Sequence, residues 1–432
     1  MSKGITARLF KGDRIIWCIF FILCILSLIE VFSASSRQTY DKSYWVPITR
    51  HAIFVISGVF IAWFIHTIRM EWIKLSSKWI YLTGIAMLIY ALFGGGAETN
   101  SSLRWIVIFG QKFQHFEVVK LGIVMFIALI LAKAQKSEGT RLSWDEAIGL
   151  ISNRIRGDGR RGDYTMLLIL CSILLPCAFI ITENLSTVII IVVVAFIMMF
   201  VGRVNGKQLL GIVGLGAAVA VLGIVTLMQV PDSFKEHGSV GSKVITWKNR
   251  FKDVADADSP QRPEDVKIKG NEQYVYSKIA IAEGGVMGRG PGNSVRRDFI
   301  PHAYNDYIFA IILEELGVLG GIFTIILYLT LLYRCGIIAK ESEDPYMAFL
   351  SIGIGVLIVF QAFLHMTISV SSFVTGQPLP LISQGGTSFI INCTYIGIVL
   401  CISRCVNKQN RRQYLKEHRK ERHFFSNNNT FF

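Results

Sequence analysis

The chain has 432 residues, of which 52% are hydrophobic and 17% are charged, against about 25% charged residues in a typical soluble domain. This composition excludes a disordered chain, a collagen-like fibre and a small disulfide scaffold, and it argues against a soluble multidomain protein. The formal net charge is +14, so the sequence also has to explain where the positive charge lies.

The apolar residues gather in runs of about 20 residues, the length that a helix needs to cross a bilayer. Ten such runs predict an all-α integral membrane protein with ten transmembrane helices. They are residues 15–34, 48–68, 78–93, 117–132, 166–182, 186–202, 208–229, 306–333, 346–369 and 387–405. We expect an N-terminus at 1–14, a membrane domain at 15–405 with a large loop at 230–305 between helices seven and eight, and a basic tail at 406–432.

Lys and Arg residues indicate the orientation of the helices. The terminal segments and loops on the same side of the membrane as the N-terminus hold 26 Lys and Arg residues, and the short loops on the other side hold five. Because cytoplasmic loops carry the excess of Lys and Arg, both termini are predicted to be cytoplasmic, and the loop at 230–305 to be extracytoplasmic. The basic residues form no aromatic-interleaved patch, which argues against a nucleic-acid partner. The tail is expected to lie along anionic lipids.

The unusual polar sequence falls in three predicted outer loops. The first runs from a glycine triplet past Arg104 to Glu117 and Lys120, at the outer end of the fourth span. Residues three apart share one face of a helix. Glu117 and Lys120 therefore form either a local ion pair or a functional pair, because ionisable residues inside a span are functional candidates by default.

The long loop ends in a glycine-rich stretch that contains Ser277, Lys278 and Gly290. Such a stretch forms ordinary turns or cradles a phosphate with backbone N–H groups, and the sequence leaves both readings open. Asp306 follows at the mouth of the eighth span, where it is either the N-cap of that helix or an ionised general base. Two adjacent carboxylates deeper in the span, at 314 and 315, indicate a polar interior or a water-filled cavity.

The third loop, at about 370–386, has two prolines and, after Ser383, the adjacent Gly385 and Gly386. Irregular backbone at membrane depth is tolerated only where it is buried in protein or lines a cavity. We therefore expect a functional site at the outer face, at or just within the outer leaflet.

Together these residues resemble the SEDS family (shape, elongation, division and sporulation) of polytopic peptidoglycan glycosyltransferases, over about 15–405. Three family patterns carry the resemblance: SKIAI-x-x-GG-x-x-G-x-G at Ser277–Gly290, D-[FY]-IFA-x-x-x-EELG at Asp306–Gly317, and TG-x-x-LPLIS-x-GG-[ST]-S at Thr375–Ser388. The last pattern and the stretch from Asn100 to Trp105 look more like the division branch than the elongation branch.

The sequence departs from the family patterns at several polar positions. These positions are His115, Phe116, Thr182, Glu183, His302, Tyr304 and Gln384. The family's aspartate and lysine are kept as Asp306 and Lys120, so the roles of those two residues carry over most directly.

The resemblance implies that the substrate is lipid II, a disaccharide-pentapeptide on undecaprenyl diphosphate. Asp306 is then the general base that activates the attacking sugar hydroxyl, and cations face the departing diphosphate. The implied substrate-binding residues are Lys120, Arg104, Glu117, Ser277, Lys278, Gly290, Ser383, Gly385 and Gly386. No cofactor is required with certainty, and a divalent metal ion, Mg or Mn, is left open.

The resemblance also implies a multi-pass protein of the bacterial cytoplasmic membrane, acting at the division site. The implied partners are a class B penicillin-binding protein as transpeptidase, other divisome proteins and membrane lipids. Three alternatives stay open: the elongation polymerase, a lipid II flippase, and a non-enzymatic division scaffold. The outward bias of the motifs argues against the flippase, which needs recognition at the inner face as well.

Overall fold

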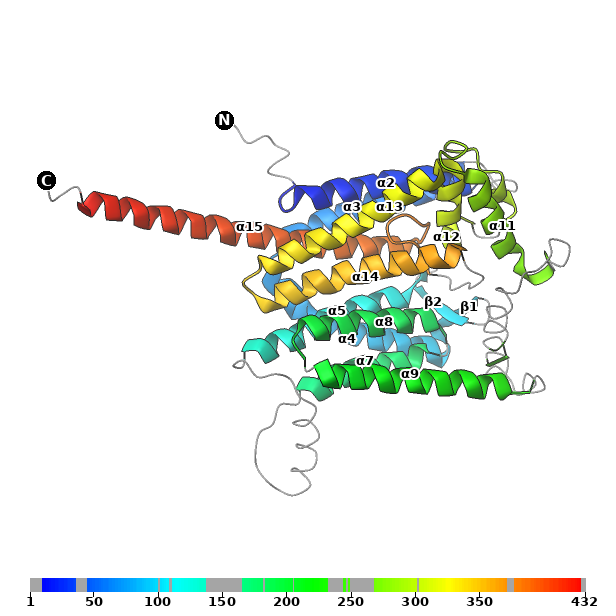
Figure 1. Ribbon diagram of the computed structural model, residues 1–432, viewed down its shortest axis with the longest axis horizontal. Coiled ribbons are helices and arrows are strands. Elements are labelled where there is room, and N and C mark those ends of the chain that lie inside the picture. Colours follow the sequence, from blue (N-terminus) through cyan, green and yellow to red (C-terminus); the bar gives the residue numbers. More distant parts are fainter. Residues whose placement is uncertain are drawn as a thin grey trace, which may run out of the picture.

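The structure, a computed structural model, is a bundle of long helices that lie roughly side by side (Figure 1). It describes residues 10–35, 45–99, 102–108, 111–136, 165–181, 183–204, 206–231, 244–245, 248, 268–300, 303–370 and 377–428. Parts of the predicted outer loop at 230–305, mainly 232–243 and 249–267, and the motif residues Thr375 and Gly376 lie outside this described part.

Each of the ten predicted spans falls on one helix of the described part. In chain order these helices are α2 (Arg14–Ala34), α3 (Trp45–Thr67), α4 (Met70–Tyr90), α5 (His115–Lys136), α7 (Thr165–Ile180), α8 (Leu185–Val201), α9 (Gly206–Gln229), α13 (Ile308–Lys340), α14 (Pro345–Val370) and α15 (Thr387–Asn428). Between α9 and α13 lie α11 (Ile268–Gly284), a 3-10 turn (Arg296–Asp298) and α12 (Ala303–Asp306).

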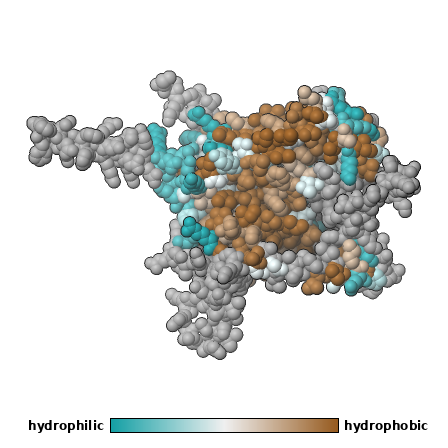
Figure 2. All heavy atoms as spheres, in the orientation of Figure 1, coloured by the Kyte–Doolittle hydropathy of each residue, from teal (hydrophilic) through white to brown (hydrophobic). Residues whose placement is uncertain are grey.

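Seven helices within the described residues are long and apolar enough to span a bilayer. They cover Arg14–Ala34, Ile48–Thr67, Met70–Phe93, His115–Lys133, Ile308–Lys340, Pro345–Thr367 and Thr387–Arg411. Leu168–Ile180 and Leu185–Val201 are apolar but shorter. A broad apolar band covers the middle of the surface, with hydrophilic residues toward its ends (Figure 2). The chain is thus an α-helical membrane protein, while ten crossings and the cytoplasmic placement of both termini stay predictions.

Two local features differ from the sequence expectation. The segment after α4 contains a short π-helix (Ala91–Gly95) and a small antiparallel sheet with the strand order β1 (Gly96–Thr99), β2 (Ser102–Ile108) and β3 (Gln111–Phe113). The third span was predicted to begin at 78, but α4 begins at Met70. Lys74 lies in the first turns of α4, and its Nζ pairs with Asp344 Oδ2 at 3.3 Å, in the turn between α13 and α14.

The core of the bundle lies around α14, which packs against α5, α8, α13 and α15. In the apolar window of α5, 89% of the residues are buried, whereas the figure for α3 is 22%. Ile53, Ile56 and Phe60 of α3 are exposed. In a bilayer, apolar side chains of this kind face lipid rather than water, so α3 belongs to the periphery of the bundle.

The two ends of the bundle carry different features. At one end, which we call the site end, lie the sheet, α11 and α12 (Figure 1). At the opposite end, the termini end, α2 begins and α15 leaves the bundle (Figure 1). Helix α15 runs without interruption to Asn428, so the predicted tail at 406–432 is helical as far as that residue.

Candidate functional site

The predicted pair Glu117 and Lys120 lies in the first two turns of α5, and both side chains are fully buried. Lys120 Nζ donates to Glu117 Oε1 at 2.7 Å. The i,i+3 spacing alone accounts for this contact, because residues three apart face the same side of a helix.

The pair is enclosed by groups from two other helices. Gln361 of α14 accepts a hydrogen bond from Lys120 Nζ at 2.6 Å, and Tyr395 of α15 donates its hydroxyl to the Glu117 carbonyl oxygen at 2.9 Å. Gln361 Nε2 also donates to Pro378 O at 3.3 Å. The two charges therefore compensate each other within a polar cage, as buried charges require.

Pro378 belongs to residues 377–386, which we call the bridging loop. Gln377 Nε2 donates to Thr187 Oγ1 of α8 at 2.6 Å, and the Gln377 carbonyl oxygen lies 2.8 Å from His365 Nδ1 of α14. Ser27 Oγ of α2 donates to Ile382 O at 2.7 Å. The irregular backbone expected here is thus buried in protein and hydrogen-bonded to helices from across the chain.

The bridging loop also holds α12. Ser383 Oγ donates to Asn305 O at 2.9 Å, and Gln384 N donates to Tyr304 O at 3.1 Å. These bonds connect the loop to the two residues just before Asp306. The buried pair on α5 and the aspartate on α12 are therefore linked through one loop.

Asp306 is the last residue of α12, and its side chain is partly exposed. Asn305 Nδ2 donates to Asp306 Oδ1 at 3.0 Å. The N-cap reading of Asp306 is wrong, because α13 begins at Ile308 with Tyr307 as its N-cap residue and no side-chain cap. The Asp306 carboxylate therefore does not cap α13.

The glycine-rich stretch at 284–292 packs against α13 where Gly317 interrupts the helical backbone. Gly317 has φ +68° and ψ −172°, a conformation that L-residues avoid. A Cβ on Gly317 would lie 2.3 Å from Val286 O, and a Cβ on Gly288 would lie 2.2 Å from Glu315 O. Gly290 N donates to Glu315 O at 2.8 Å. These glycines thus permit a close backbone contact, and this N–H group of Gly290 is engaged within the protein.

The adjacent carboxylates in α13, Glu314 and Glu315, anchor the segment 292–297, which precedes α12. Glu314 Oε1 accepts from Val295 N at 2.9 Å, and Glu315 Oε2 accepts from Gly292 N at 2.8 Å. Arg297 Nη1 lies 3.9 Å from Glu315 Oε1. Backbone N–H groups and a guanidinium therefore satisfy two buried acids.

The end of α11 is held by an ion-pair cluster on the surface. Glu283 Oε2 lies 3.0 Å from Arg289 Nη2 and accepts a hydrogen bond from Arg296 Nε, also at 3.0 Å. The hydrogen bond from Arg296 holds the pKa of Glu283 below its usual value. The cluster ties α11 to the 3-10 turn that precedes α12.

The other predicted substrate-binding residues differ in location and burial. Ser277 is buried and Lys278 is exposed on α11, while Gly385 is buried and Gly386 has φ +52° in the bridging loop. Arg104 is on β2, but its side chain lies outside the described part.

Among the family departures, His115 and Phe116 are buried at the start of α5, and Glu183 is largely buried just before α8. Tyr304 and Gln384 are half-buried and joined through their backbones. Thr182 and His302 lie outside the described residues.

Sequence reasoning missed Gln361, His365 and Tyr395, which complete the cage and hold the bridging loop. The signal was available, since Gln361 and His365 are four residues apart in an otherwise apolar span. Polar residues at i and i+4 share a helix face, and in a membrane they need partners.

In the described part, no three His, Cys, Asp or Glu side chains group together in a way that could hold a metal ion. Magnesium sites commonly use one or two carboxylates together with substrate phosphates. Asp306 is one carboxylate of the described part that is exposed enough to contribute to such a shared site.

Several known proteins are similar over most of the chain. A Neisseria gonorrhoeae protein described as "Probable peptidoglycan glycosyltransferase FtsW" is 28% identical over 394 residues, covering 85% of this chain and 79% of the relative. The Bacillus subtilis protein with the same description is 27% identical, with 89% of each chain covered. "Stage V sporulation protein E" of Bacillus subtilis is 26% identical and covers 92% of this chain and 99% of its own length.

Solved structures share the fold. One, described as "Structural coordination of polymerization and crosslinking by a peptidoglycan synthase complex", has a TM-score of 0.65 at 21% identity and covers 91% of this chain and 98% of its own. Thermus thermophilus RodA has a TM-score of 0.59 at 19% identity, covering 91% and 97%. The model of the FtsW/RodA/SpoVE family, described as cell cycle proteins, matches residues 13–408, and with nearly the whole chain matched this protein belongs to that family.

Proposed function

We propose that this protein is a peptidoglycan glycosyltransferase that polymerises lipid II at the outer face of the cytoplasmic membrane. The observation that carries the proposal is the linkage of Asp306, the bridging loop and the Glu117–Lys120 pair at one end of the bundle. The relatives described as glycosyltransferases support the same reaction class.

In the proposed reaction, a sugar hydroxyl of one substrate attacks the anomeric carbon of another, and the lipid diphosphate leaves. The hydroxyl is a weak nucleophile, so a positioned carboxylate should accept its proton as the new bond forms. Asp306 suits that role because it is partly exposed and its helix does not use it as a cap.

The leaving diphosphate gains negative charge, and a nearby cation would stabilise it. Lys120 and Arg104 are the proposed cations, with Glu117, Ser277, Lys278, Gly290, Ser383, Gly385 and Gly386 as the wider proposed binding set. Lys120 is held by Glu117 and Gln361, so its role requires that the diphosphate approaches this cage. A shared Mg or Mn ion would add a second positive charge, and polymerisation after chelation tests for it.

The proposed partner is a class B penicillin-binding protein, which would crosslink the strands that this chain makes. The structural neighbour described as a peptidoglycan synthase complex supports such a pairing. Relatives described as FtsW support the division branch over the elongation branch. A fluorescent fusion that gathers at midcell would fit this assignment, and a fusion spread along the sidewall would contradict it.

The decisive experiment gives lipid II to the purified protein with its partner and measures glycan strands. Asp306→Asn should lower the polymerisation rate by about 100-fold or more, the range for losing a general base, while the protein still accumulates in the membrane. Asp298→Asn, at a second half-buried carboxylate just upstream, is the matched control and should stay near the unmodified rate. An active Asp306→Ala protein would refute the assignment.

A further inference from the structure

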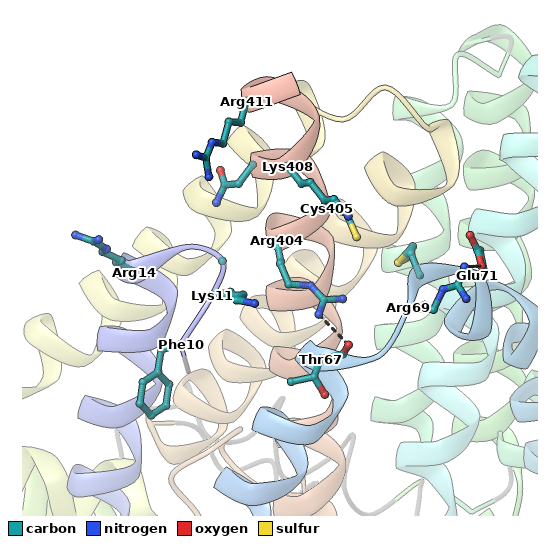
Figure 3. Close-up of a pocket in the computed structure, with 13 residues that line it drawn as sticks. Phe10, Lys11, Arg14, Thr67, Arg69, Glu71, Arg404, Cys405, Lys408 and Arg411 are labelled. Carbon is teal, nitrogen blue, oxygen red and sulfur yellow. Dashed lines mark hydrogen bonds and ion pairs between the residues drawn. The ribbon is translucent and has the colours of Figure 1, made fainter. Parts of the chain in front are cut away.

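A cavity opens at the termini end of the bundle, opposite the proposed catalytic site. It lies between the start of α2, the turn from α3 to α4 and the part of α15 near Arg404 (Figure 3), and its volume is about 900 Å³. Six basic side chains and one acidic side chain line it, a net charge of +5. The basic residues are Lys11, Arg14, Arg69, Arg404, Lys408 and Arg411.

Two of these cations have partners in the wall of the cavity. Arg69 Nη2 pairs with Glu71 Oε2 at 3.0 Å. Arg404 Nη1 donates to Thr67 O at 2.8 Å, and its Nη2 donates to Ile68 O at 2.5 Å, so it closes the end of α3. Among the described residues, no carboxylate lies within 4 Å of the side-chain nitrogens of the other four, Lys11, Arg14, Lys408 and Arg411.

Two acidic residues near these helices, Asp13 and Glu341, are engaged elsewhere. Asp13 accepts a hydrogen bond from Ile15 N at 2.8 Å and another from Arg334 Nε of α13 at 2.7 Å. Glu341 accepts from Asn410 Nδ2 at 3.2 Å. Neither carboxylate is part of the cavity lining. The excess positive charge is therefore not neutralised from within the described part of the chain.

The lining is suited to an anion that also carries apolar groups. Phe10 and Met70 line the cavity beside the cations. Phe10 is edge-on to Trp17, with ring centroids 5.0 Å apart, and Trp17 stacks on Phe21 at 5.7 Å. Aromatic residues gather at the membrane–water interface, and guanidinium groups bind phosphate through paired hydrogen bonds. A free phosphate would make no use of the apolar wall.

We propose that this cavity binds the headgroup of an anionic phospholipid, with the phosphate among the cations of α2 and α15 and the apolar part of the lipid against Phe10. Lys11 and Arg404 reach into the space between these helices, while Arg14 and Arg411 stand at its rim (Figure 3). The predicted orientation places this end at the inner leaflet, where anionic lipids attract basic segments.

The test measures binding of short-chain phosphatidylglycerol to the full-length protein in neutral detergent, by native mass spectrometry and by thermal shift. One copy should bind and raise the melting temperature, whereas phosphatidylcholine of equal chain length should do neither. Lys408→Gln/Arg411→Gln should weaken binding by about tenfold or more, since each lost cation removes a charge-assisted hydrogen bond. Arg404 is left unchanged because it closes α3.

Lys133→Gln/Lys340→Gln is the control that removes the same charge from exposed lysines near the ends of α5 and α13, and binding should change less than threefold. Both double variants should elute as single species with melting temperatures near that of the unmodified protein without lipid. Equal weakening by the control, equal binding of phosphatidylcholine, or inorganic phosphate binding as tightly as phosphatidylglycerol would each overturn the proposal. Polymerisation of lipid II is a separate readout, so loss of lipid binding and loss of the proposed enzyme activity can be told apart.

Discussion

Removing the Lys120 ammonium should measure how much the buried ion pair with Glu117 contributes to the stability of the fold. In Lys120→Met, the Glu117 carboxylate keeps full burial but loses the ammonium at 2.7 Å. Gln361 and Tyr395 stay beside it, yet neither carries a compensating charge. Breaking a buried ion pair by removing one partner costs about 3–5 kcal/mol, so we expect a loss of that size in the free energy of unfolding.

The double variant Glu117→Gln/Lys120→Met removes both charges and separates stability from function. Replacing a buried pair by neutral groups is often neutral or stabilising, so the double variant should recover most of the lost stability. If Lys120 also faces the leaving diphosphate, polymerisation should stay low in both variants. Unfolding in detergent and glycan synthesis with the partner protein measure the two effects.

Two results would refute this reasoning. A Lys120→Met protein within about 0.5 kcal/mol of the unmodified stability would show that the carboxylate is solvated or neutralised by another group. A double variant with full polymerisation would remove Lys120 from the proposed site and leave it a purely structural role.

Two further predictions concern the packing of the site end. Gly317→Ala should lower stability by about 2 kcal/mol or more, because its φ is +68° and the new Cβ would meet Val286 O at 2.3 Å; Gly336→Ala in the same helix meets nothing within 4 Å and should leave thermal unfolding unchanged or slightly improved. Glu283 has a lowered pKa in the folded protein, so its contribution is present at neutral pH and is lost as the pH falls through that folded value. The protection of α11 amides against hydrogen exchange, corrected for the intrinsic pH dependence of exchange, should fall on acidification. Glu283→Gln should flatten this response, and an unchanged pH response in that variant would show that other groups cause it.

The sequence predicted features that depend on local pattern. Apolar runs located the ten helices, and the three-residue spacing predicted the contact between Glu117 and Lys120. Contacts across long sequence separations could not be predicted. Gln361 is 241 residues from Lys120, and Asp344 is 270 residues from Lys74, so neither the complete cage nor the ion pair of Lys74 follows from a local window.

The role of Asp306 shows the same limit on a smaller scale. Asn and Asp are favoured N-caps, and the sequence alone could not tell whether the helix begins at 306 or 308. The start is set by tertiary contacts, because Ser383 and Gln384 bind the carbonyl groups of Asn305 and Tyr304 and so hold α12 apart from α13.

The bridging loop also has a consequence for the order in which the protein is assembled during synthesis. Ser27 donates to Ile382 O, and 355 residues separate the two. At about 5–20 residues per second, the ribosome needs roughly 20 to 70 s to supply that acceptor. Thr187 on α8 and Gln361 on α14 also await residues of this loop. Until then Ser27 can bond only to a nearer partner such as His51 of α3, whose Nε2 lies 2.9 Å from its Oγ. The contacts that close the site end form only when residues 377–386, near the end of the chain, have been made.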